Sequence, residues 1–157
     1  MINIFVSKYK DNKCVNKLFK KKIIILYMTL LSAFNTQVEN LITDLGKLYP
    51  NESDIKIFKE KFKLIKFANP RMIIENFIAF VYPYKQFIMN KKEEYFLEDN
   101  NSIDREFKEN DISLTKVINF KNLWLKTSDE NKEAIWKYFQ VLIILSERWF
   151  KENTLKK

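Results

Sequence analysis

The stretch MTLLSAFNTQVENLITDLGKL, residues 28–48, decides the fold. From Leu31 onward its apolar residues recur at alternating steps of three and four, at positions 31, 34, 38, 41, 45 and 48. This spacing predicts an amphipathic helix whose apolar stripe faces a core. The 157 residues include one Gly and three Pro, too few turn residues for a sandwich or barrel. The expected fold class is therefore all-α, a single-domain bundle of about five helices.

Proline and capping residues divide the middle of the chain. A second helix is expected from about Ser53, a suitable N-cap, with an apolar stripe at positions 55, 58, 62 and 65. Asn69 and Pro70 are typical of an N-cap followed by a first-turn proline, so they predict the start of a third helix. Pro83 must break or kink that helix near Tyr82, with a further helical piece at 84–90.

The C-terminal third is expected to hold the central helix. Residues 91–111 are rich in acidic groups and predict an exposed connector, with a short helical turn at 93–97. A fourth helix is expected over 113–125, and a fifth from Thr127-Ser128-Asp129 to about Lys151. The fifth has almost no polar face, as is typical of a helix that is covered on several sides. The expected helical domain is therefore 28–151, followed by a frayed tail at 152–157.

The segment 1–27 allows three interpretations. It shows no helical period of its own, so a disordered basic tail, or a true start of translation at Met28, is the main expectation. The apolar run 23–34, preceded by three lysines, could instead be a signal or membrane anchor. A functional basic arm is the third interpretation. The run is too short for a conventional transmembrane helix, so a membrane is not an expected partner.

Charge gives weak support for nucleic-acid binding. The chain has 28 basic and 20 acidic residues, a formal net charge of +8. Residues 1–27 account for +6 of that charge, so the rest of the chain carries only +2. Long-range electrostatic attraction between the helical domain and nucleic acid should therefore be no stronger than for a typical protein.

Several classes of chemistry are excluded by residue inventory. Histidine is absent, which removes Ser-His-Asp triads and nearly all zinc sites. The lone Gly46 excludes glycine-rich phosphate and dinucleotide loops, and the lone Cys14 excludes an internal disulfide. Carboxylates of the connector could in principle hold a metal. Metal ligands need a rigid framework, however, and a loop does not provide one. We expect no catalytic residues, no cofactor and no metal, and so no enzyme.

The most regular basic feature lies on the second helix. Lys56, Lys59, Lys63 and Lys66 repeat at steps of three and four, beside the apolar stripe. This lysine ridge could meet phosphates as point charges, without reading base sequence. A solvated helix face is the plainer interpretation, since Glu60 interrupts the charge.

Aromatic residues suggest partner contacts at two places. Tyr82 and Tyr84 flank Pro83, and Trp149 and Phe150 stand near the C-terminus beside basic residues. If these side chains are exposed, they are candidates for protein–protein contact.

Three stretches carry a family resemblance: residues 30–59, residues 67–100 and residues 123–149. Within them, Asn69-Pro70-Arg71, residues 82–84 and residues 130–138 are the most characteristic. They resemble small uncharacterised proteins of nucleocytoplasmic large DNA viruses, of the mimivirus and phycodnavirus kind. The resemblance implies a start near Met28 and a viral setting, in the host cytoplasm or the virion, but no activity and no site.

The function expected from these observations is a non-enzymatic viral adaptor or structural protein that acts through protein–protein contacts and can also form homo-oligomers. The alternatives are a sequence-neutral nucleic-acid binder that uses the lysine ridge, and a membrane-tethered protein that uses residues 23–34.

Overall fold

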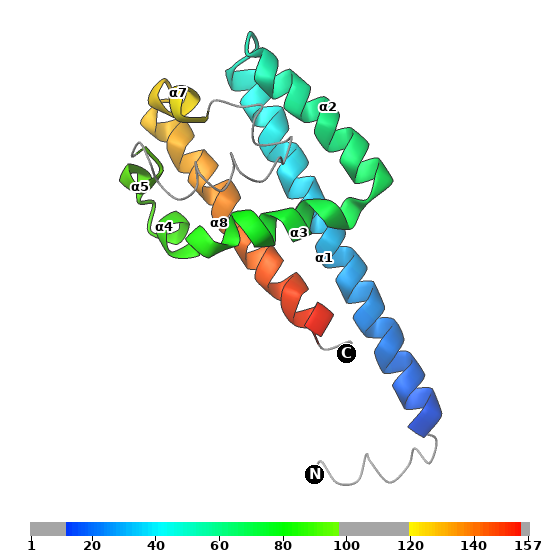
Figure 1. Cartoon of the computed structure of the whole chain (residues 1–157). Helices are drawn as coiled ribbons and strands as arrows, with labels where there is room; N and C mark the ends of the chain where they lie inside the picture. Colours follow the sequence, from blue (N-terminus) through cyan, green and yellow to red (C-terminus); the bar gives the residue numbers. More distant parts are fainter. Residues whose placement is uncertain (1–11, 98–119, 155–157) are drawn as a thin grey trace.

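The computed structural model describes residues 12–97 and 120–154 (Figure 1). The long helices are α1 (Asn12–Leu48), α2 (Ser53–Ala68), α3 (Pro70–Phe80) and α8 (Asp129–Thr154). The short elements are the 3-10 turn η2 (Tyr82–Tyr84) and the helices α4 (Lys85–Met89), α5 (Glu93–Leu97) and α7 (Phe120–Leu125). No strand occurs within the described ranges, and the predicted all-α bundle is confirmed.

Helices α1 and α8 lie side by side in antiparallel directions and form the axis of the bundle (Figure 1). Helix α2 folds back along α1, and α3 crosses α1 and α8. The side chains of Phe34, Ile74 and Ile143, from three different helices, are fully buried where these elements meet. The ring of Phe34 meets Phe77 edge to face, with 5.2 Å between centroids. Because α8 contacts α1, α3 and α4, the prediction of a central C-terminal helix is confirmed.

The first helix begins much earlier than expected. The prediction that this helix begins near Met28 is wrong, because α1 is continuous from Asn12. Tyr27, four residues before Leu31, continues the buried stripe by one more turn. Its ring lies 5.3 Å from that of Trp149, centroid to centroid. The core therefore includes the last residue of the expected tail, while residues 1–11 lie outside the described part of the chain.

The predicted boundaries of the middle helices are mostly confirmed. The side chain of Asn69 accepts a hydrogen bond from the backbone N–H of Arg71, and Pro70 occupies the first turn of α3. Pro83 ends the α-helical path in η2, as expected. The prediction of Ser53 as the N-cap of α2 is wrong, because Ser53 is already helical. Glu52 is the N-cap; its backbone is extended and its side chain makes no capping hydrogen bond.

The C-terminal elements agree with the prediction in part. The short helix at Glu93–Leu97 is confirmed. Helix α8 begins at Asp129, as expected, and runs to Thr154, so residues 152–154 are helical rather than frayed. Most of the acidic connector and the first part of the helix expected at 113–125 lie outside the described residues, as do residues 155–157.

Candidate functional site

The α2 outer face, which we define by Ile57, Leu64 and Phe67, holds the exposed large apolar side chains of α2. Leu64 is 69% exposed, Phe67 is 93% exposed, and Ile57 is exposed as well. The three positions fall on one side of a helix with 3.6 residues per turn. The buried residues Ile55 and Phe62 lie on the other side. Helix α2 is therefore apolar on two faces, of which one packs on the core and one is open.

The lysine ridge is divided between ion pairs and open surface. The Nζ atom of Lys66 lies 2.6 Å from a carboxylate oxygen of Glu39, on α1. The Nζ atom of Lys63 lies 2.9 Å from a carboxylate oxygen of Glu60, within α2. Among the described residues, Lys56 and Lys59 have no such carboxylate partner, and Lys56 is exposed while Lys59 is half-buried. Only part of the predicted ridge is thus available as free positive charge.

The tyrosines on either side of Pro83 point into the protein. The hydroxyl of Tyr82 donates a hydrogen bond of 2.8 Å to Glu147 on α8, and Lys85 forms an ion pair with the same carboxylate. These contacts, that of Lys85 first, hold the pKa of Glu147 below its usual value. Tyr84 is buried, 6.0 Å from the ring of Tyr95 between centroids. Of the three residues, only Pro83 is exposed. The tyrosines of η2 therefore serve mainly to pack this turn against its neighbours, and they offer little surface to a partner.

The two aromatic residues near the C-terminus have opposite environments. Trp149 is only 2% exposed, which contradicts its predicted availability for partner contact. The guanidinium of Arg71 lies 5.7 Å from the ring centroids of both Trp149 and Tyr27 and covers this aromatic pair. Phe150 is 52% exposed and stays a candidate contact.

One carboxylate of the connector has a structural role. A carboxylate oxygen of Glu93 accepts a 2.7 Å hydrogen bond from the indole N–H of Trp124 and lies 3.1 Å from the Nζ atom of Lys132. These two contacts, in that order, lower the pKa of Glu93. No cluster of acidic or cysteine ligands suited to a metal ion occurs in the described ranges. The connector carboxylates from residue 98 onward lie outside those ranges.

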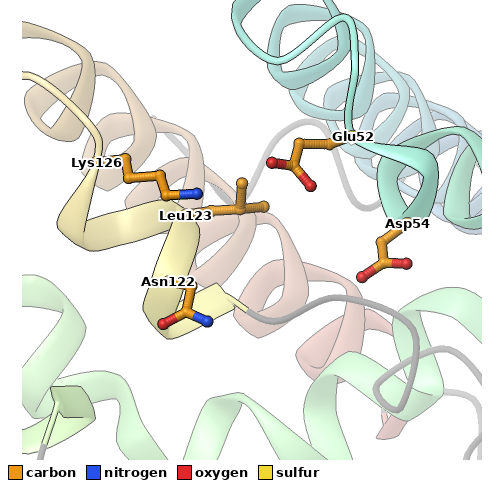
Figure 2. Close-up of a pocket in the computed structure, with 5 residues that line it drawn as sticks. All are labelled: Glu52, Asp54, Asn122, Leu123 and Lys126. Atoms are coloured by element: carbon orange, nitrogen blue, oxygen red, sulfur yellow. The ribbon is translucent and has the colours of Figure 1, made fainter.

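A small hollow separates the start of α2 from α7 (Figure 2). It measures about 120 Å³, and Glu52, Asp54, Asn122, Leu123 and Lys126 line it. Figure 2 shows the two carboxylates on one side and the amino group of Lys126 on the other. Drug-sized ligands occupy pockets of roughly 300 Å³ or more, so this hollow offers too little enclosure for a substrate of that size.

The second half of the apolar run 23–34 supplies residues to the bundle core. Its residues Leu30, Leu31 and Phe34 are buried in the core. Within the part of the chain that the structure describes, no helix has both the length and the apolar character that crossing a bilayer requires.

The α2 outer face escaped prediction because the stripe at 55, 58, 62 and 65 accounted for the helix. Ile57, Leu64 and Phe67 lie outside that stripe, among lysines. The positions of all apolar residues on α2 indicate a second apolar face, but its exposure to solvent depends on the packing of the helices.

The chain was compared with family models, curated proteins and solved structures, and none of them matches it. The resemblance to proteins of large DNA viruses therefore stays a prediction.

Proposed function

We propose that this protein is a non-enzymatic helical adaptor, which binds a partner protein through the α2 outer face. The observation that carries the proposal is the exposure of Phe67 and Leu64 on a helix whose opposite face is buried in the core. Large aromatic and aliphatic side chains that are open to solvent on a rigid element are typical of protein interfaces.

The core fixes the α2 outer face in place, which favours tight binding. Ile55 and Phe62 anchor the helix from its inner side, and the ion pair of Lys66 with Glu39 ties it to α1. A preorganised surface loses little conformational entropy when a partner binds.

Lysines next to the α2 outer face indicate the chemistry of the partner. Lys56 and Lys63 are exposed on the same helix as Leu64 and Phe67. The complementary ligand is an amphipathic helix with an apolar row and acidic edges, in the mode by which helical segments dock on apolar surfaces. The resemblance noted above extends the proposal to a viral setting, in the host cytoplasm or the virion.

Nucleic-acid binding through the lysine ridge is the weaker candidate. Two of its four lysines have carboxylate partners within reach, which reduces the positive charge available to phosphates. Exposed Leu64 and Phe67 would also lack apolar contacts on a phosphate backbone.

A site-specific photo-cross-linker at Leu64, in cells that contain the protein, would test the proposal. We expect it to capture a protein at an acidic amphipathic segment. The variant Leu64→Gln/Phe67→Gln, with the cross-linker moved to Ile57, should lose that product. The control Val141→Gln/Ile144→Gln removes two exposed apolar residues of α8 and should retain it. Equal loss in both variants, or a cross-link to nucleic acid, would overturn the proposal.

A further inference from the structure

The N-terminal turns of α1 project from the bundle. Helices α1 and α8 run antiparallel, and Tyr27 packs on Trp149 near the C-terminal end of α8. Figure 1 shows the N-terminal end of α1 extending beyond the end of α8. The exposed side chains of these turns therefore form a surface separate from the α2 outer face.

This projecting part of α1 is strongly basic. Lys17, Lys20, Lys21 and Lys22 are all exposed. The sequence contains no Asp or Glu over residues 12–38, and no ion pair joins the four lysines to a carboxylate of the described residues. Such a cluster of one sign favours an anionic partner.

Apolar side chains follow the lysines directly. Ile24, Ile25, Leu26 and Met28 are exposed, and Ile25 reaches 57% exposure. Within residues 24–28, only the side chain of Tyr27 enters the core. The surface thus combines four exposed lysines with about one helical turn of unburied aliphatic residues.

We infer that residues 17–28 bind the surface of an anionic lipid bilayer. A basic helix with exposed aliphatic residues lies in the interface, where lysines meet lipid phosphates and apolar side chains enter the acyl boundary. Lysine stems also lie along apolar surface while their amino groups stay in water. The binding is peripheral, since Leu31 and Phe34 in the same helix belong to the protein core. This inference does not depend on the proposed function of the α2 outer face.

Two other occupants fit the surface less well. A second copy of the chain, paired through Ile24 and Ile25, would bring its own lysine cluster close to the first, and the like charges would repel. Nucleic acid would neutralise the lysines, but it would leave the aliphatic residues exposed to water. An anionic bilayer satisfies both halves of the surface.

Sedimentation of the full chain with lipid vesicles would test this inference. The probes are vesicles of phosphatidylcholine alone and vesicles in which about a third of the lipid is phosphatidylserine, at low and high salt. We expect binding to the anionic vesicles only, with a strong decrease at high salt because of screening. The variant Lys20→Glu/Lys21→Glu/Lys22→Glu should weaken binding at least tenfold. The variant Ile24→Gln/Ile25→Gln/Met28→Gln should weaken it as well.

The matched control reverses three charges elsewhere, with Lys56→Glu/Lys59→Glu/Lys63→Glu on α2, and should retain most of the binding. Circular dichroism would verify that each variant keeps its helix content. The inference is overturned if the α2 control loses binding as strongly as the α1 variant. It is equally overturned if the glutamine variant binds vesicles like the parent chain while light scattering shows that it changes from dimer to monomer.

Discussion

The hydroxyl of Tyr138 donates a 2.5 Å hydrogen bond to the Oδ2 atom of Asp44, which joins α8 to α1. The other oxygen of the same carboxylate lies 2.9 Å from the Nζ atom of Lys47. The Tyr138 bond first, and then Lys47, lower the pKa of Asp44. The same bond raises the pKa of Tyr138 to about 12. The two axial helices are therefore joined by a contact whose strength depends on the protonation states of Asp44 and Tyr138.

The variant Tyr138→Phe should lower the free energy of unfolding by about 1 kcal/mol at neutral pH, since a hydrogen bond to a partly exposed charged group is lost. Asp44 is half-exposed, so water replaces the lost donor and limits the cost. Urea denaturation of both proteins would measure the difference. The control Tyr49→Phe removes a hydroxyl whose partner is the neutral side chain of Thr127, so its effect should not depend on the ionisation of a carboxylate.

The difference between Tyr138→Phe and the parent chain should depend on pH. Because the pKa of Asp44 is lower in the folded protein, the contribution is present at neutral pH and disappears as the pH falls through that folded-state pKa. At alkaline pH, the raised pKa of Tyr138 means that its contribution is complete below the ordinary value of 10.0 and disappears as the pH rises toward 12. A difference that stays constant from acid to alkali would contradict this assignment.

The lysine ridge allows structural and functional lysines to be separated. The variant Lys66→Glu places a second carboxylate beside Glu39, so we expect a loss of about 1 kcal/mol in the free energy of unfolding, at the upper end for exposed pairs. The variant Lys56→Glu should leave stability unchanged. Chemical denaturation would compare the two variants. Adding Glu39→Lys to Lys66→Glu should recover the lost stability. If Lys56→Glu is equally destabilising, the ion pair with Glu39 has no special role.

Local signals in the sequence were sufficient to predict much of the fold. Asn69-Pro70 starts α3 and Pro83 ends it because capping and ring constraints act within a few residues. The apolar spacing after Leu31 predicted the core face of α1 because the period of a helix is fixed by its geometry.

The early start of α1 and the surfaces proposed for binding could not be predicted in the same way. The burial of Tyr27 depends on Trp149, which lies more than a hundred residues away in the sequence. Likewise, periodicity alone does not show whether Leu64 and Trp149 face solvent or a neighbouring helix. Those assignments require the packing of α1 against α2 and α8.

Arg71 should stabilise the junction of α1, α3 and α8 through its two aromatic contacts. We expect Arg71→Ala to lower the free energy of unfolding by about 1–2 kcal/mol, since two cation–π contacts are lost. Arg71→Lys should have an intermediate effect because a lysine keeps the charge but lacks the planar guanidinium. The control Glu75→Gln removes only the 3.0 Å ion pair with Arg71 and should cost less than Arg71→Ala. Thermal unfolding would rank the variants, and a control as damaging as Arg71→Ala would contradict the aromatic role.

Lys91 follows α4 in a left-handed backbone conformation, with φ at 53°. Glycine adopts this conformation without the steric cost of a Cβ atom, which is about 1 kcal/mol for other residues. Lys91→Gly and Lys91→Ala both remove the ion pair with Glu133, but only glycine relieves the backbone. We therefore expect the glycine variant to be more stable than the alanine variant by about 1 kcal/mol. Urea denaturation of the two variants would measure this difference directly, and equal midpoints would mean that the turn after α4 does not hold residue 91 in the left-handed conformation in solution.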